Sequence, residues 1–230
     1  EGRIAVPANR NHKCLSAKGV GAGMKTKVNV NLGISADKGS FDSETEKVRL
    51  AEQYKADALM DLSVSGDTRR FRRHLVETSS LVIGTVPIYD TLTRTGKAVK
   101  DITMDDWFDT VEIHAADGVD FVTIHAGLTS DCLQTLKADR RLAGIVSRGG
   151  SILAEWMVKN GRENPFFEHF DRLLDICLEY DVCISLGDGL RPGALKDASD
   201  AAQFHELIML GRQTKAAWQR GVQVIIEGPG

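Results

Sequence analysis

An acid between two glycines, followed closely by an arginine, ends one of the apolar runs of this sequence. The run Cys183 to Leu186 stops on Gly187-Asp188-Gly189, and Arg191 follows two residues later. A strand that only fills a core needs neither a carboxylate nor a guanidinium at its end. The spacing therefore indicates a strand that delivers an anion and a cation to one place, although the two can also form an ion pair that only holds a loop.

A second segment with chemical potential is Ser147-Arg148-Gly149-Gly150-Ser151, between an apolar run and a predicted helix. Glycines allow backbone N–H groups to point at an oxyanion, and a helix N-terminus favours negative charge. The guanidinium of Arg148 can bind two phosphate oxygens at once. The segment is a candidate anion cradle, while Gly-Gly also occurs in ordinary turns.

Polar, aromatic or sulfur-bearing residues end other apolar runs as well. They are Asn31, Met60, Tyr89, His125 and Glu227. Each has a purely structural alternative, because Asn favours turns, Met and Tyr fill cores, a lone His is often a hydrogen-bonded core residue, and Glu can hold a loop. Together with Arg148, Asp188 and Arg191 they predict a site for a small polar phosphate ester, in which arginine binds phosphate and carboxylates bind hydroxyl or amino groups.

These residues are positioned by an alternation of apolar runs and helical patterns. Seven runs are predicted as strands: 25–33, 57–63, 81–88, 118–126, 143–147, 181–186 and 222–227. Continuous apolar runs are typical of parallel strands that are buried on both faces. Seven regular units predict an α/β fold, a (β/α)8 TIM barrel with seven βα units visible and the eighth missing from the chain. The carboxyl ends of all strands would then meet at one rim.

Helices are predicted between these strands from their capping residues. They begin at a capping box over 43–46, at Asp67, near Met104, near residue 131, at Ser151, at Asn164-Pro165 and near Ser199. Residues 1–24, rich in glycine and polar residues, are predicted as an N-terminal arm or lid, and 25–230 as the barrel. The segment Asn31 to Ser35 lacks G-x-G-x-x-G, which disfavours a dinucleotide-binding sheet.

Composition excludes several functional classes. The 29 Lys and Arg against 32 Asp and Glu leave a net charge of −3, so we expect no nucleic-acid binding. The basic cluster at 69–73 is interpreted as a solvated helix face. No apolar stretch reaches the ~18–20 residues of a membrane span, the N-terminus has no signal-peptide pattern, and the four cysteines form no C-x-x-C pair. These features predict a cytoplasmic chain with no membrane partner.

Several motifs together resemble one family. They are Pro7-Ala8-Asn9, Met60 to Ser63, Ile83 to Tyr89, Thr123 to Gly127, Gly144 to Ser151, Ser185 to Gly193 and Glu227 to Gly230. Over nearly the whole chain these segments resemble the phosphomethylpyrimidine synthase family of ThiC-type radical S-adenosylmethionine enzymes. The resemblance implies a (β/α)8 barrel that binds aminoimidazole ribotide. The substrate contacts that it implies are Asn31, Met60, Tyr89, His125, Ser147, Arg148, Gly149, Asp188, Gly189, Leu190, Arg191 and Glu227.

The cofactors are also implied by the resemblance. They are a 4Fe-4S cluster, S-adenosyl-L-methionine and a divalent metal, zinc or iron, all ligated beyond Gly230, together with the radical-generating residues. The barrel would thus be truncated before the cluster-binding C-terminal segment, and these residues alone are expected to be inactive. The resemblance further implies a homodimer.

Two products are compatible with the implied contacts. The arm Pro7 to Lys13 (PANRNHK), the strand end Asn29 to Ser35 (NVNLGIS) and a lengthened loop after His125 depart from the thiamin-pathway pattern. We therefore favour the paralogue that makes 5-hydroxybenzimidazole for cobamide lower ligands, with phosphomethylpyrimidine as the alternative. A metal-dependent phosphosugar enzyme and a non-catalytic ribotide-binding fragment are the more distant alternatives.

Overall fold

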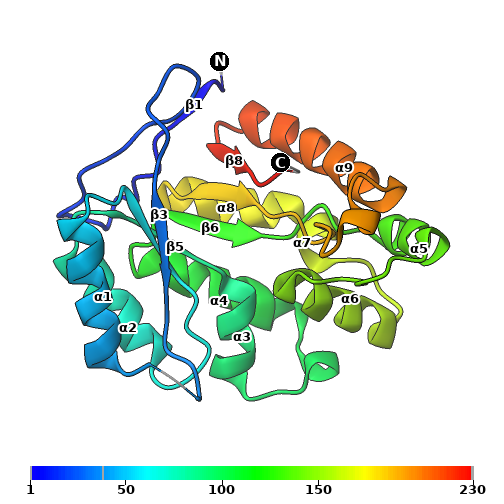
Figure 1. The fold of residues 1–230 in the computed structure, drawn as a ribbon, viewed down its shortest axis with the longest axis horizontal. Helices are drawn as coiled ribbons and strands as arrows, with labels where there is room; N and C mark the ends of the chain where they lie inside the picture. The colour runs from blue at the N-terminus through cyan, green and yellow to red at the C-terminus, as the bar shows by residue number, and fades with distance from the viewer. Residues whose placement is uncertain (1, 38, 229–230) are drawn as a thin grey trace.

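The computed structural model describes residues 2–37 and 39–228, and a parallel sheet runs through its centre (Figure 1). Its strands follow in chain order: β3 (Asn29–Leu32), β4 (Ala58–Asp61), β5 (Val82–Thr85), β6 (Phe121–Ile124), β7 (Cys183–Leu186) and β8 (Val224–Ile226). Every residue of β5, β6 and β7 is buried, whereas β3 and β8 at the two edges are partly exposed. The predicted α/β fold with a parallel sheet is confirmed.

Helices connect the strands. They are α1 (Phe41–Gln53), α2 (Thr68–Thr78), α3 (Pro87–Thr95), α4 (Met104–Ala116), α5 (Ser130–Asp139), α6 (Arg148–Asn160), α7 (Pro165–Glu168), α8 (Phe170–Tyr180) and α9 (Ala201–Gln219), with 3-10 turns η1 (Val99–Asp101) and η2 (Leu195–Asp197). Figure 1 shows α1 and α2 beside the β3 end of the sheet and α9 beside β8. Among the described residues, no helix combines the length and apolar character needed to cross a membrane.

Two of the predicted helix starts shift. Helix α1 begins three residues early because Ser40, not Ser43, is its N-cap, and the capping box joins these two serines. Helix α6 begins at Arg148 because Ser147 Oγ accepts the Gly150 N–H at 3.1 Å, so Ser151 is not the cap. The predicted caps Asp67 and Asn164 are confirmed.

The prediction of a strand at 143–147, and with it of seven visible βα units, is wrong. Strands β6 and β7 pair directly, with Phe121 opposite Cys183, so no strand lies between them. The N–H groups of Leu142 and Ala143 donate instead to the Asp197 carboxylate, at 2.7 and 2.8 Å. With the N–H of Ala143 at its start bound to a side chain, residues 143–147 form a loop that leads into α6.

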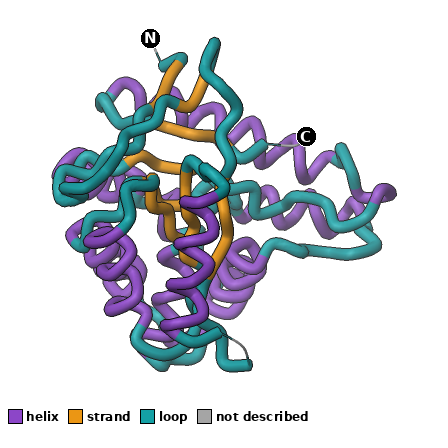
Figure 2. Tube along the Cα trace, turned by 60° about the vertical axis from the view of Figure 1, so that its left-hand side comes forward, coloured by secondary structure: helices purple, strands orange, loops and turns teal. Residues whose placement is uncertain are grey.

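The sheet is curved. Asn29 of β3 and Glu227, directly after β8, line the same cavity of 220 Å³, together with Met60 and Ser185 from strands between them. Residues from both edges meet at this cavity, so the sheet bends around it, and Figure 2 shows the strands at the centre with helices around them. In the described part of the chain β8 and β3 are not paired, so these strands form an open sheet and not a closed barrel.

The N-terminal arm is tied to the amino ends of the strands. Its strands β1 (Ile4–Ala5) and β2 (Val20–Gly21) pair antiparallel. Asp120, which precedes β6, accepts the backbone N–H of Asn9 at 2.9 Å and contacts His12 Nδ1 at 2.8 Å. The same carboxylate accepts the Ile83 N–H at 2.7 Å. The arm therefore shares one buried carboxylate with the start of the sheet.

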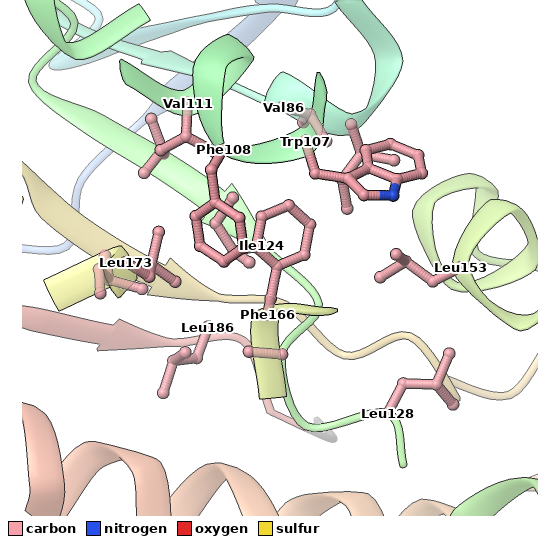
Figure 3. Close-up of a cluster of buried hydrophobic side chains, with 14 of the residues drawn as sticks. Val86, Trp107, Phe108, Val111, Ile124, Leu128, Leu153, Phe166, Leu173 and Leu186 are labelled. Carbon is pink, nitrogen blue, oxygen red and sulfur yellow. The ribbon is translucent and has the colours of Figure 1, made fainter. Parts of the chain in front are cut away.

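The main hydrophobic core lies between the sheet and α4, α6, α7 and α8. The rings of Phe108 and Phe166 meet with centroids 5.3 Å apart, and Trp107 packs on Phe166 from the other side at 6.2 Å (Figure 3). Ile124 of β6 and Leu186 of β7 face this cluster. The core packs against β6 and β7, which end just before residues that were predicted to form the site.

Candidate ligand-binding site at the strand ends

An anion cradle forms where α6 starts. Ser147, Arg148 and Gly149 occupy its N-cap and first two positions, so the N–H groups of Arg148 and Gly149 have no backbone partner within the helix. The Arg148 guanidinium lies over the ring of Tyr89, with Cζ 4.9 Å from the ring centroid. Tyr89 was predicted at a strand end. It lies instead in the first turn of α3, because Pro87 occupies the first position of that helix.

His125 lies directly after β6, against this cradle. Its Nε2 is 3.2 Å from Ser147 Oγ, and its Nδ1 has no hydrogen-bond partner among the described residues although it is buried. A Cβ at Gly149 would lie 2.3 Å from the imidazole, so only glycine fits there. Burial, and then the positive charge of Arg191, lower the pKa of His125 to about 4. At neutral pH the site thus holds a neutral imidazole with one unused nitrogen.

The turn after β7 carries the acid Asp188 and the cation Arg191. Asp188 Oδ1 and Arg191 Nη1 are 3.5 Å apart, and the Arg191 N–H donates to Asp188 O at 3.3 Å. The pKa of Asp188 is raised, because the effect of burial exceeds the lowering by the positive charge of Arg191. The Arg191 side chain remains 41% exposed, so it is available to a ligand at the rim.

Glu227 completes this group from the end of β8. Its Oε1 accepts hydrogen bonds from Thr123 Oγ1 at 3.2 Å and Ser185 Oγ at 3.1 Å. Burial first, and then the negative charge of Asp188, raise the pKa of Glu227. The carboxylate therefore belongs both to the inner cavity and to the charged rim.

The expected residues fall into one group and one neighbouring pair. Burial raises the pKa of Tyr89. The positive charges of Arg191 and Arg148 oppose this rise and the negative charge of Glu227 adds to it, so all three charges lie near the phenol. Asn31 and Met60 stand side by side in register on β3 and β4. Met60 lines the cavity shared with Glu227, whereas Asn31 is exposed and accepts from Asn29 Nδ2 at 3.1 Å.

Two buried residues that were not predicted to contact the site hold its backbone in place. Asn164 Nδ2 donates to His125 O at 2.9 Å and to Leu128 O at 2.8 Å. Glu206 on α9 accepts the N–H groups of Gly189 and Leu190 at 2.8 and 2.7 Å, and burial raises its pKa to about 7. Glu206 was detectable in the sequence as an acid in the helical stripe that also contains Ala202 and Leu210, both buried.

This arrangement suits a small anionic ligand with polar groups. Two guanidinium groups and the N-terminus of α6 favour phosphate, and the two carboxylates are acceptors for hydroxyl or amino hydrogens. Within residues 2–37 and 39–228, no group of three or more His, Cys, Asp or Glu could hold a metal ion. Cys132, Cys177 and Cys183 are each buried and unpaired. The described residues therefore do not fit an iron–sulfur cluster.

A curved parallel sheet with charged residues at its carboxyl ends defines an α/β protein with a candidate site for a small anionic molecule. The chain belongs to the radical SAM ThiC family, whose model matches residues 1–230. It is 59% identical over 230 residues to phosphomethylpyrimidine synthase of Clostridium perfringens (strain SM101 / Type A), covering 100% of this chain and 53% of that protein. The enzyme of the same name from Clostridium tetani is 56% identical, with 100% of this chain and 50% of that protein covered.

The chain therefore spans about half the length of the curated relatives that it matches. Among solved structures, dihydropteroate synthase of Xanthomonas albilineans aligns over 96% of this chain and 92% of that chain, with 10% identity and a TM-score of 0.33. At that TM-score the likeness carries no conclusion about the fold or the ligand.

Proposed function

We propose that the chain is the substrate-binding part of a phosphomethylpyrimidine synthase, a radical S-adenosylmethionine lyase that rearranges aminoimidazole ribotide. The observation that carries this proposal is the match of the family model along all 230 residues, with relatives of that name 56–59% identical over the same length. The charged rim supports it, because a ribotide combines a phosphate with hydroxyl and amino groups.

In this proposal the ribotide phosphate binds at Ser147, Arg148 and Gly149. Asp188, Arg191 and Glu227 contact the polar groups of the ribotide, and His125 uses its free Nδ1. The remaining contacts are Asn31, Met60, Tyr89, Gly189 and Leu190. The partly exposed guanidiniums, the unpaired imidazole nitrogen and the N-terminus of α6 support these roles.

The cofactors belong to the same proposal. The family implies S-adenosyl-L-methionine and a 4Fe-4S cluster, and since the described residues offer no cluster site, we place the cluster ligands, and those of a divalent metal, outside these 230 residues. We further propose that residues 1–24 are an arm, that 25–230 belong to a (β/α)8 barrel whose remaining strands lie between β8 and β3, and that the enzyme is a cytoplasmic homodimer.

The product distinguishes two candidates on this scaffold. The names of the relatives favour the phosphorylated pyrimidine over 5-hydroxybenzimidazole. The benzimidazole, favoured above, still has the departures at residues 7–13 and 29–35 in its support. We propose the pyrimidine as the main product, with the benzimidazole as the second candidate.

Product analysis of the full-length enzyme tests the proposal. The reconstituted protein is incubated anaerobically with aminoimidazole ribotide, S-adenosylmethionine and a reductant, and the products are identified by mass spectrometry. Phosphomethylpyrimidine is expected. 5-Hydroxybenzimidazole would replace it with the second candidate, and ribotide binding without either product would refute the lyase and favour a non-catalytic role.

A further inference from the structure

Glu206 is a buried acid with no cationic partner. Glu206 is 1% exposed, and none of the ion pairs among the described residues includes it. Burying a carboxylate is unfavourable unless its oxygens are hydrogen-bonded, and replacing buried charges by apolar groups is often neutral or stabilising. A glutamate at this core position of α9 is therefore poorly explained by stability alone.

Each oxygen of the Glu206 carboxylate serves one backbone donor. Oε1 accepts the Gly189 N–H at 2.8 Å and Oε2 accepts the Leu190 N–H at 2.7 Å. The two N–H groups are consecutive and lie between Asp188 and Arg191. The Leu190 side chain is fully buried, so both the side chain and the N–H of this residue are occupied within the protein.

The first turn of α6 packs closely against the same Asp188–Arg191 turn. A Cβ at Gly150 would lie 2.3 Å from Gly189 O and 2.8 Å from Gly189 Cα, and a Cβ at Gly189 would lie 3.0 Å from Glu206 Oε1. The turn is therefore held between the first turn of α6 and the carboxylate of α9. Any movement of the turn changes the distance from Asp188 and Arg191 to the cradle.

We propose that Glu206 is a positioning residue, which sets Asp188 and Arg191 against the Ser147–Gly149 cradle through the N–H groups of Gly189 and Leu190. This inference depends on the proposed function, since it takes the rim as the ribotide site. It assigns the N–H groups of Gly189 and Leu190 to holding the turn, because they are already bound to Glu206, so any contact of these two residues with the ribotide is made by their other atoms.

The test uses Glu206→Gln in the full-length enzyme. Glutamine keeps the size of the side chain, but its amide nitrogen faces one of the two N–H groups and cannot accept from it. Leu173→Ala in α8 is the control, since Leu173 is fully buried in the main core and belongs to another helix. This control reports what a loss of packing does on its own.

Two measurements are made on each variant. Hydrogen exchange of the Gly189 and Leu190 amides reports on the turn, and equilibrium binding of the ribotide and, separately, of S-adenosylmethionine reports on the site. Well above pH 7, where the Glu206 carboxyl is ionised, we expect faster exchange in Glu206→Gln and a loss of ribotide affinity of about tenfold or more, as for a lost hydrogen bond to a charged group. S-adenosylmethionine affinity should stay unchanged, and Leu173→Ala should retain the affinity for ribotide.

Unchanged ribotide affinity in Glu206→Gln would overturn the proposal, whether or not exchange is faster. An equal loss in Leu173→Ala would overturn it too, because the effect would then be one of stability. A wild-type enzyme that does not bind the ribotide would refute the proposed function, and with it this role. The exchange rates would then still show whether Glu206 restrains the turn.

Discussion

The guanidinium of Arg148 lies over the ring of Tyr89, with Cζ 4.9 Å from the ring centroid. The contact joins the first turns of α6 and α3, two helices that follow different strands. Stacking on an aromatic face restrains a guanidinium while its N–H donors remain free at the edge. Arg148 has no ion pair among the described residues, so its charge is held in place without being neutralised.

Removal of this charge should weaken ligand binding without unfolding the protein. For Arg148→Ala we expect ribotide affinity to fall by the free energy of a charged hydrogen bond, about 1.5–3 kcal/mol, as measured by calorimetry on the full-length enzyme. Arg212→Ala is the matched control, since Arg212 is exposed on α9 and its described contact is with Met209 Sδ at 3.6 Å. Equal affinities for Arg148→Ala and the wild type would rule out the phosphate role of Arg148.

The backbone contact between Gly150 and Gly189 should tolerate no side chain. In Gly150→Ala the added Cβ would meet Gly189 O at 2.3 Å, so we expect a loss of about 1–3 kcal/mol in the free energy of unfolding. The control is Gly211→Ala in α9, where no heavy atom lies within 4 Å of the new Cβ. That substitution should stabilise the protein by about 0.5–1 kcal/mol. Urea unfolding measures both, and a neutral Gly150→Ala would contradict the close approach.

A buried charge network should dominate the stability of the α2–α3–α4 region. Arg72, 1% exposed at its side chain, bridges Asp90 Oδ2 at 3.2 Å and Asp117 Oδ2 at 2.9 Å, and His114 Nε2 lies 2.9 Å from Asp90 Oδ2. The interpretation of 69–73 as a solvated face is thus wrong for Arg72. Arg72→Met leaves the buried Asp90 carboxylate without its arginine and leaves Asp117 paired with Arg69 alone, so we expect a loss of about 3–5 kcal/mol.

The neighbouring arginine supplies the control for that prediction. Arg73 pairs with Glu77 at 3.4 Å on the surface, where both side chains are more than half exposed. Arg73→Ala should change the free energy of unfolding by no more than about 0.5 kcal/mol. Similar losses for Arg72→Met and Arg73→Ala in thermal and urea unfolding would show that the network contributes little.

Acid should destabilise the protein through His125. Its pKa is about 4 in the folded protein, below the ordinary value of 6.5 that holds in the unfolded chain, because burial disfavours the charged ring. Above pH 6.5 the ring is neutral in both states, and its contribution is fully present. Between pH 6.5 and about 4, His125 is protonated in the unfolded chain but not in the folded protein. The free energy of unfolding therefore falls as the pH falls.

The slope of that loss is measurable by comparison with His125→Gln. The wild type should lose up to about 1.4 kcal/mol more per pH unit than the variant between pH 6.5 and 4. His114, whose pKa is also lowered to about 4, is present in both proteins and cancels in the difference. Parallel stability curves across this range would show that His125 titrates normally.

The sequence by itself was sufficient to predict the α/β class, the six strands of the parallel sheet and most of the rim residues. Continuous apolar runs are typical of parallel strands that are buried on both faces. The residues that follow such strands share one edge of the sheet. For this reason Asp188 and Glu227 were correctly placed at strand ends, whereas Arg148 was predicted after a strand and lies instead in the first turn of α6, after a loop. Local chemistry also determined the helix starts at Asp67 and Asn164, since a cap needs only neighbouring backbone N–H groups.

Only the tertiary structure decided which groups hold these residues in place. Segment 143–147 has the pattern of a strand, yet Asp197, distant in sequence, accepts the N–H groups of Leu142 and Ala143 where the segment begins, and β6 pairs with β7. The contact of Glu206 with Gly189 and Leu190 likewise joins a helix to a turn 16–17 residues away. Periodicity reports which face of an element is apolar, whereas partners between distant elements depend on how the whole chain packs.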